Sequence, residues 1–174
     1  MIYDLLSAYS GITMKASTSK LKSEQVNDLT KESVREMFVG AWRLVSYESR
    51  LPNGEVRLPY GEGPKGFVIY DESGCFSLNM MKSDRDVFSA DDLAGGTAEE
   101  LGYAFNTFAA YSGHYEFDLK QQAIIHNIQS SLHPNLTNTA QLRFFNITET
   151  SLELVTPEVL IKGLNVRIVK WERV

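Results

Sequence analysis

Three polar residues of chemically active types occur in the second half of the chain, namely His126, Tyr115 and Arg143. A histidine exchanges protons near pH 7, and a tyrosine hydroxyl can orient its ring. An arginine can hold a carboxylate or stabilise the negative charge of an enolate. We therefore expect a catalytic group in which His126 moves a proton beside Tyr115 and Arg143 stabilises an anionic oxygen.

A predicted hairpin around Lys120-Gln121 places His126 next to Tyr115. Successive side chains of a strand point to opposite sides, so a two-residue turn here fixes which residues share a face. The inward pairs are Phe117 with Ile124, Tyr115 with His126, Gly113 with Ile128 and Tyr111 with Ser130. This face is mainly apolar and the other is mostly polar, so His126 points inward. There it acts on a proton, or it is a core histidine satisfied by Tyr115.

A second predicted hairpin, around Glu149-Thr150, places Arg143 on an inward face. Its inward pairs are Ile147 with Leu152, Phe145 with Leu154 and Arg143 with Thr156. Burying a polar group or a charge is costly unless it is hydrogen-bonded or paired. An interior that contains Arg143 and His126 is therefore expected to enclose a ligand or water, and about eight strands leave room for one small ligand.

The elements that would position these residues are short strands joined by tight turns. The predicted strands cover residues 39–50, 55–59, 66–70, 75–81, 111–118, 122–131, 139–147, 151–156 and 164–173. Asn53-Gly54 is a strong signal for a tight turn. In the hairpin over 66–81, the inward face is expected to hold Phe67, Ile69, Phe76, Leu78 and Met80. This pattern predicts a mainly β protein, an antiparallel barrel of about 8–10 strands.

Helical signals interrupt the strand pattern at three places. Thr30 is the expected N-cap of a helix over 31–38, and Thr97 with Glu100 forms a capping box for a helix over 97–110. That second helix has an apolar stripe of Leu101, Phe105 and Phe108, and is expected to cover an open end of the barrel. Apolar residues within 1–9 also have helical spacing, and 10–30 is a polar linker. We therefore divide the chain into an N-terminal extension and linker at 1–37 and a barrel domain at 38–174.

Composition argues against several classes of function. The net charge of −5 repels phosphate backbones, so no nucleic-acid partner is expected. Cys75 is the single cysteine and is expected to be a plain thiol without a disulfide.

We find no signal peptide and no membrane span, which favours the cytoplasm. No glycine loop, nucleophile elbow or dinucleotide fingerprint is present, so no cofactor is expected. No metal site is expected either, because His114 faces away from His126 and His133 does not complete a zinc pattern.

The chain resembles the lipocalin-like domain family over nearly all of residues 38–174. The resemblance lies in the run from Gly40 to Glu48 with its Gly-x-Trp motif, in Pro59-Tyr60-Gly61, in Gly66 to Tyr70 before Gly74, in Tyr111 to Tyr115, in His126, Ser130, Pro134 and Arg143, and in the closing Trp171-Glu172-Arg173. It implies that Trp42 plugs the closed end of a barrel with an arginine over its ring, either Arg173 or Arg143. Arg143 therefore has a structural alternative to binding a ligand.

The resemblance implies an interior that holds a small, mostly apolar molecule. Some members occur beside secondary-metabolite genes, where such barrels act as isomerases or cyclases without cofactors. The expected ligand-lining residues are Trp42, Tyr70, Met80, Phe105, Tyr111, Ile128, Ser130, Phe145 and Trp171. Three functions stay open: a cofactor-free isomerase or cyclase of a small hydrophobic biosynthetic intermediate, a non-catalytic carrier, and an interaction module working through residues 1–9 and 97–110. Residues 1–9 would dock on the barrel or form a homodimer contact.

Overall fold

The structure, a computed structural model, describes residues 30–92, 95–160 and 163–174. The segments expected at 1–9 and 10–29, with the homodimer contact predicted for 1–9, lie outside the described residues. The helices are α1 (Lys31–Phe38) and α2 (Ala98–Asn106), with a short 3-10 helix η3 at Pro134–Leu136. None of the described helices is long and apolar enough to cross a membrane.

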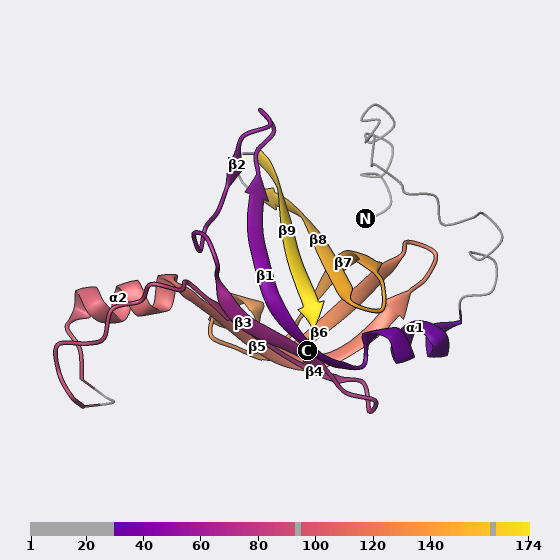
Figure 1. Ribbon diagram of the computed structural model, residues 1–174, viewed down its shortest axis with the longest axis horizontal. Helices are drawn as coiled ribbons and strands as arrows, with labels where there is room; N and C mark the ends of the chain where they lie inside the picture. The colour runs from indigo at the N-terminus through magenta and orange to yellow at the C-terminus, as the bar shows by residue number, and fades with distance from the viewer. Residues whose placement is uncertain (1–29, 93–94, 161–162) are drawn as a thin grey trace.

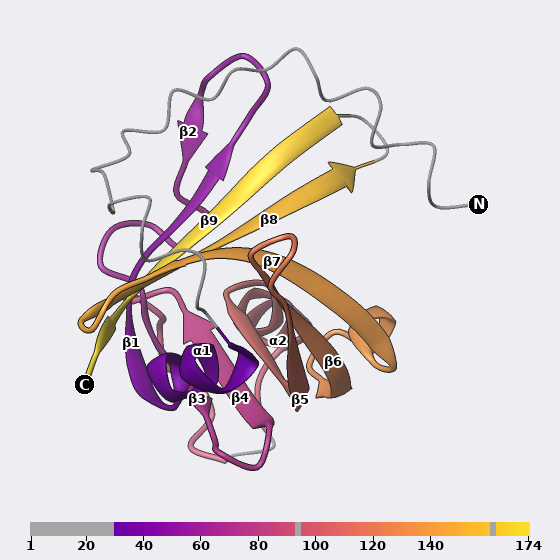
Figure 2. The same ribbon diagram turned by 90° about the vertical axis from the view of Figure 1, so that its right-hand side faces the viewer.

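Nine strands form one antiparallel sheet that closes on itself (Figures 1 and 2). They are β1 (Gly40–Arg50), β2 (Val56–Arg57), β3 (Lys65–Tyr70), β4 (Cys75–Met81), β5 (Phe108–Asp118), β6 (Ala123–Ser131), β7 (Thr139–Ile147), β8 (Ser151–Leu160) and β9 (Gly163–Arg173). Strand β2 extends the sheet beside the end of β1, and the pairing of β1 with β9 closes the others into a barrel. Closure leaves no long unpaired edge, and the predicted mainly β antiparallel barrel is confirmed.

The β3–β4 hairpin turns a different set of side chains inward than its sequence predicted. A backbone hydrogen bond of 2.9 Å joins the Asp71 amide to the Cys75 carbonyl, so Tyr70 lies opposite Phe76. The inward pairs are Tyr70 with Phe76, Val68 with Leu78 and Gly66 with Met80. The three expected residues of β4 do point inward. The same expectation for Phe67 and Ile69 is wrong, because they belong to the other face and are 43% and 50% exposed.

Helix α1 lies at one end of the barrel (Figure 2), and two of its apolar side chains belong to the buried core. It begins at the predicted N-cap, where Thr30 Oγ1 accepts a hydrogen bond from the Ser33 amide at 3.1 Å. Val34 and Phe38 are four residues apart, so they share one helix face, and both are buried. The Phe38 ring packs at centroid distances of 5.0–5.2 Å against the rings of Tyr70, Phe117 and Phe145.

Trp42 of the first barrel strand and Arg173 of the last both donate hydrogen bonds to backbone carbonyls at the end of α1. The Trp42 indole donates a hydrogen bond to the Phe38 carbonyl at 2.8 Å and is fully buried. The Arg173 guanidinium lies 4.1 Å from the Trp42 ring centroid, in cation–π contact. It donates to the backbone carbonyls of Met37 at 2.6 Å, Val39 at 3.0 Å and Glu149 at 2.6 Å. The arginine over Trp42 is therefore Arg173, and the structural alternative for Arg143 is removed.

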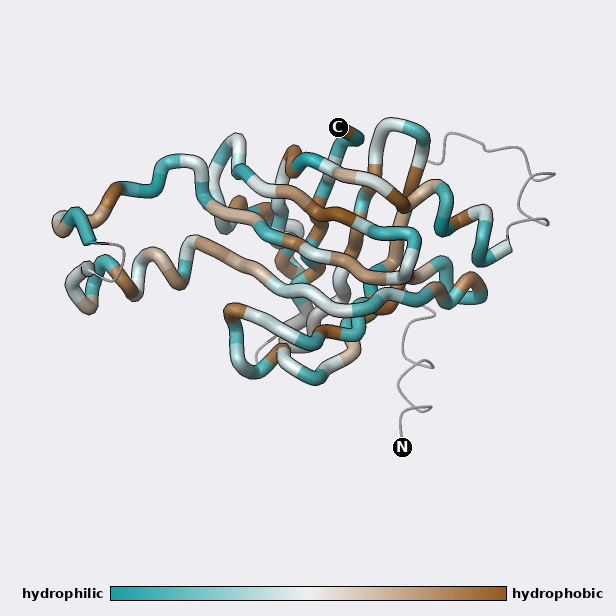
Figure 3. Tube along the Cα trace, turned by 90° about the horizontal axis from the view of Figure 1, so that it is seen from below, coloured by the Kyte–Doolittle hydropathy of each residue, from teal (hydrophilic) through white to brown (hydrophobic). Residues whose placement is uncertain are grey.

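The connection between β4 and β5, which carries α2, extends away from the barrel (Figures 1 and 3). The predicted capping box of Thr97 and Glu100 is present. The helix ends at Asn106 and not at 110, because Phe108–Ala110 pair with β4 and so satisfy their backbone groups in the sheet. No residue of α2 is buried, and Leu101 is 48% exposed. The expected cover over the barrel end is therefore not formed.

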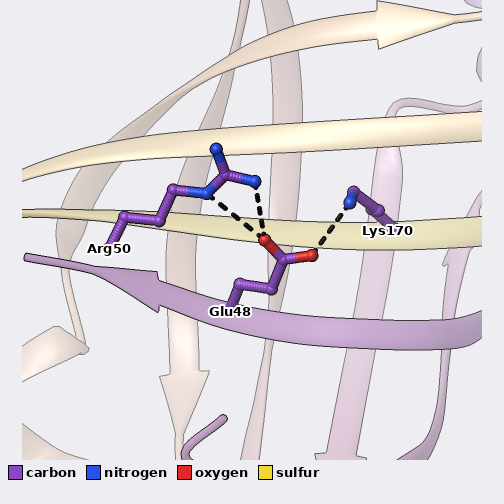
Figure 4. A network of polar contacts seen from close by, with 3 residues as sticks. All are labelled: Glu48, Arg50 and Lys170. Carbon is purple, nitrogen blue, oxygen red and sulfur yellow. Dashed lines mark hydrogen bonds and ion pairs between the residues drawn. The ribbon is translucent and has the colours of Figure 1, made fainter. Parts of the chain in front are cut away.

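An ion network ties the outer faces of β1 and β9 together (Figure 4). Lys170 Nζ lies 2.8 Å from Glu48 Oε1, and Arg50 Nη2 lies 2.9 Å from Glu48 Oε2. The Glu48 side chain is only 13% exposed. The hydrogen bond from Lys170 lowers the pKa of this carboxyl against the effect of burial, and the hydrogen bond from Arg50 lowers it further.

We predict that Arg173→Met lowers the free energy of unfolding by about 2–4 kcal/mol, because three charge-assisted hydrogen bonds and the cation–π contact are lost. Urea unfolding followed by tryptophan fluorescence measures the change. Arg43→Met is the matched control, since its guanidinium is 63% exposed and pairs only with Glu172 in the part of the chain described. The control should change stability by less than about 1 kcal/mol, and equal losses in the two variants would contradict the prediction.

Glu48→Gln should destabilise the protein at pH 7 by about 1 kcal/mol, the size of a partly exposed ion pair. A carboxyl whose pKa is lowered in the folded state stabilises it above the pKa of the unfolded state, and this stability is lost as the pH falls through the folded pKa. The difference between the variant and the wild type should therefore disappear in acid. Thermal unfolding from pH 7 to pH 3 tests this, and a difference that persists in acid would refute it.

Candidate functional site

His126 lies on the inward face of β6 and is fully buried. Its Nε2 atom is 2.9 Å from the Tyr70 hydroxyl, with which it shares a hydrogen bond. Its ring stacks on Phe76, with centroids 4.2 Å apart and planes 16° apart. Its Nδ1 atom is buried and has no hydrogen-bond partner. One polar position of this histidine is therefore unsatisfied inside the barrel.

The His126 ring is held in its neutral form. Burial lowers its pKa well below the usual value, and the charge of Arg143 lowers it further. Burial also raises the pKa of the Tyr70 hydroxyl well above its usual value, so this hydroxyl keeps its proton. A neutral imidazole has one donor nitrogen and one acceptor nitrogen. Whichever partner donates in the Tyr70 hydrogen bond, Nδ1 has one unused donor or acceptor position.

Arg143 lies on β7, opposite Ile124 of β6, and is half-buried. Its Nη1 atom donates to the carbonyl of Leu142 at 2.9 Å. Among the described residues, no carboxylate forms an ion pair with it. The pairing of β7 with β8 ends at Phe144 and Val155. The predicted pair of Arg143 with Thr156 would be the next one and is not formed. Its positive charge acts on both His126 and Tyr70, so these three residues, from β7, β6 and β3, form one polar cluster.

Tyr115 lies opposite His126 on the inward face, as the hairpin register predicted. Its hydroxyl does not serve the histidine. It donates instead to the carbonyl of Asp71 at 2.8 Å, in the β3–β4 turn. The partner of His126 is Tyr70, which the sequence placed among the lining residues only. Tyr70 reaches His126 across the barrel from a strand that is not its neighbour, and no local pattern contains that contact.

The residues predicted to line a ligand fall into three groups. Those buried inside the barrel are Trp42, Tyr70, Met80, Ile128, Phe145 and Trp171. Tyr111 also points inward, half-buried and edge-on to Phe76 at 5.8 Å. Within the buried group, Trp42, Phe145 and Tyr70 all contact α1 at the closed end, and Tyr70 is also part of the His126 cluster. Phe105 and Ser130 form the third group, outside the interior.

The predicted inward position of Ser130 is wrong. The register shifts between Ser112 and Gly113, so Ser130 lies opposite Ser112 and not opposite Tyr111. The two serine hydroxyls are 3.0 Å apart and belong to a hollow of about 330 Å³ over β4, β5 and β6. A β-bulge of this kind adds one residue to a strand and reverses the alternation beyond it.

Phe105 is separated from the barrel interior because it belongs to α2. Its ring lies 4.8 Å from the ring of His133. His114 contacts Cys75, with Nδ1 3.6 Å from Sγ, on the exposed face of β4 and β5. The three histidines are therefore apart, and no group of three metal-ligating side chains occurs within the described ranges.

Sequence reasoning missed the buried polar residue Ser49, whereas Thr156 is buried on the inward face of β8 as the predicted hairpin placed it. Both lie opposite Arg167 of β9, one on each side. The register of β1 shifts between Leu44 and Ser46, so the inward residues change from even to odd numbers there. Alternation counted from Trp42 therefore assigns Ser49 to the wrong face. Thr156 continues the inward series of Leu152 and Leu154, as predicted.

Comparison with known proteins decides the family. A sequence model of the lipocalin-like domain matches residues 39–174. The chain belongs to the lipocalin-like domain family. A curated relative is the 4'-hydroxy-3'-methoxypropiophenone carrier protein ppsC of Aspergillus oryzae, 29% identical over 105 residues that cover 56% of this chain and 95% of the relative. No solved structure is significantly similar to the chain. The family and the relative support small-molecule binding by this lipocalin-like barrel.

We predict that His126 makes stability fall in mild acid. A histidine whose pKa is lowered in the folded state stabilises it above the unfolded pKa, and this stability is lost as the pH falls below that value. Below about pH 6.5 the wild type should lose roughly 1.4 kcal/mol per pH unit more than His126→Gln. Urea unfolding at pH 7, 6 and 5 measures the two slopes. His114→Gln is the exposed control and should keep the wild-type slope, and equal slopes for all three proteins would contradict the prediction.

Proposed function

We propose that this lipocalin-like protein binds a small, mostly apolar molecule inside the barrel and carries it unchanged. The observation that carries the proposal is the unsatisfied Nδ1 of His126 beside a half-buried arginine without a carboxylate partner in the described chain. Leaving a buried polar atom unpaired costs about 1–3 kcal/mol. A ligand oxygen or hydroxyl would satisfy that atom, so binding would recover part of this cost.

The surroundings of the cluster suit a flat, apolar ligand. Phe76 stacks on His126, and the rings of Tyr70 and Tyr111 lie 5.8 Å and 6.1 Å from it. Ligand sites are commonly built of apolar and aromatic walls with a few polar groups that set orientation. The named ligand of the Aspergillus oryzae relative is an aromatic ketone with hydroxyl and methoxy groups. A ligand of that type would match aromatic walls and a polar cluster.

A second candidate is a cofactor-free isomerase or cyclase of a small biosynthetic intermediate. A neutral histidine next to a cation favours it, because His126 could take a proton from a carbon beside a carbonyl while Arg143 stabilises the enolate oxygen. The same proton would return to another carbon, so the step needs no co-reactant. Tyr70 would orient the imidazole in place of Tyr115. The lowered pKa makes His126 a weak base, and for this reason we place the carrier first.

The cytoplasmic location stays a prediction.

The deciding experiment is native mass spectrometry of the protein after incubation with a metabolite extract from its source. A ligand released unchanged supports the carrier. A ligand released in a chemically altered form supports the enzyme, and His126→Gln should then reduce turnover far more than affinity. If nothing binds to the folded protein, both functions fail and an interaction module becomes the better explanation.

Binding of N-phenyl-1-naphthylamine, followed by its fluorescence, tests whether the ligand lies in the interior. Met80→Trp adds bulk to the inward face of β4 and should weaken binding about tenfold, or 1.4 kcal/mol. Ile69→Trp is the control on the exposed face of β3 and should bind as the wild type does. Circular dichroism shows whether both variants are folded. Wild-type affinity in a folded Met80→Trp protein would place the ligand elsewhere.

A further inference from the structure

The described inward side chains of the barrel strands have a charge opposite to that of the whole protein. The chain has a net charge of −5. Among the described side chains, the inward positions of the barrel strands hold Arg143, Arg167 and Arg173 but no aspartate or glutamate. The one carboxylate of β1, Glu48, lies on its outer face with Lys170 and Arg50. An unpaired charge inside a protein is costly, so Arg143, which has no carboxylate partner among the described residues, needs a physical explanation.

The three inward arginines are not equivalent. Arg173 is fully engaged at the closed end, where its guanidinium donates to three backbone carbonyls. Arg167 lies near the Tyr60 hydroxyl, whose pKa it lowers against the larger effect of burial. Arg143 donates only to the carbonyl of its neighbour Leu142, and it lies opposite Ile124, two positions from His126 on the same inward face of β6. Arg143 is therefore the inward cation with donors available for a ligand.

We infer that the ligand is a flat apolar molecule with an acidic oxygen, and that it binds as the anion with this oxygen at Arg143 and His126. The inference rests on the proposed function and names the ligand class for the same site. A phenolate, an enolate or a carboxylate has the required chemistry, since each combines a negative oxygen with a conjugated body. The guanidinium supplies charge-assisted hydrogen bonds to that oxygen. Nδ1 of His126 supplies one further hydrogen bond when it carries the ring proton.

Two coumarins that differ only in the acidic proton test this inference. 7-Hydroxycoumarin ionises to an anion that absorbs at longer wavelength, whereas 7-methoxycoumarin cannot ionise. We expect wild-type protein to bind ionised 7-hydroxycoumarin about tenfold or more tightly than 7-methoxycoumarin. By linkage, the pKa of the bound hydroxyl should then fall by about one unit or more, which a spectroscopic titration measures directly. Affinity should rise with pH until the free probe is ionised.

Arg143→Met should reduce the preference for the anion to about twofold or less, because the guanidinium that distinguishes the ionised probe from the neutral one is removed. Arg43→Met removes an outward guanidinium from the same barrel and should keep the full preference. A second pair, 2-naphthoate and its methyl ester, shows whether a carboxylate is preferred over a phenolate. Thermal unfolding confirms that both variants are folded.

Three results would overturn the inference. Equal binding of the charged and neutral members of both pairs would show that the interior selects no anion, and the proposed carrier function would still stand. A preference that persists in Arg143→Met would place the anion elsewhere. If the folded wild-type protein binds none of these probes and no N-phenyl-1-naphthylamine, the inference and the proposed function fail together.

Discussion

The closed end of the barrel depends on the contact between Arg173 and Trp42. Arg173 is the last residue of β9 and Trp42 stands near the start of β1, so their contact joins the two strands that close the sheet. The same guanidinium satisfies carbonyls at the end of α1 and in the turn after β7. The Trp42 indole satisfies a further carbonyl of α1. This end is therefore held by hydrogen bonds and aromatic packing, and the contact of Phe38 with Tyr70 links it to the His126 cluster.

The polar cluster has a cost that a solid core would avoid. His126 is buried with an open hydrogen-bond position, and Arg143 has no carboxylate partner in the described chain. Replacement of such groups by apolar residues of similar volume is often neutral or stabilising in other proteins. Keeping them inside a barrel therefore points to an oxygen-bearing ligand. The lowered pKa of His126 makes it a weak base, which favours hydrogen bonding to a ligand over proton transfer and is the physical reason to place the carrier before the enzyme.

Where the alternation of side chains ran unbroken, prediction from the sequence succeeded. The hairpin between β5 and β6 places Tyr115 opposite His126 as expected, and that between β7 and β8 places Phe145 opposite Leu154. Prediction from the sequence failed wherever an extra residue or a different turn shifted the alternation of inward and outward side chains. The extra residue Gln129 in β6 moved Ser130 outward, and the shift after Leu44 in β1 moved Ser49 inward. The turn at Asp71 placed Tyr70 inward instead of Ile69. Side chains alternate between the two faces of a strand with a period of two. A shift of one residue therefore moves every later side chain of that strand to the opposite face.

The sequence by itself determined the class of fold, the two capped helices and the inward direction of His126, since capping and alternation are local properties of the chain. Only the tertiary structure decided which residues meet inside. Tyr70 and His126 lie 56 positions apart, and Arg173 lies 131 positions from Trp42 (173 − 42). Such contacts form when the sheet curves and closes, which no pattern within one strand encodes. The polar cluster and the positive inner face are for the same reason products of barrel closure.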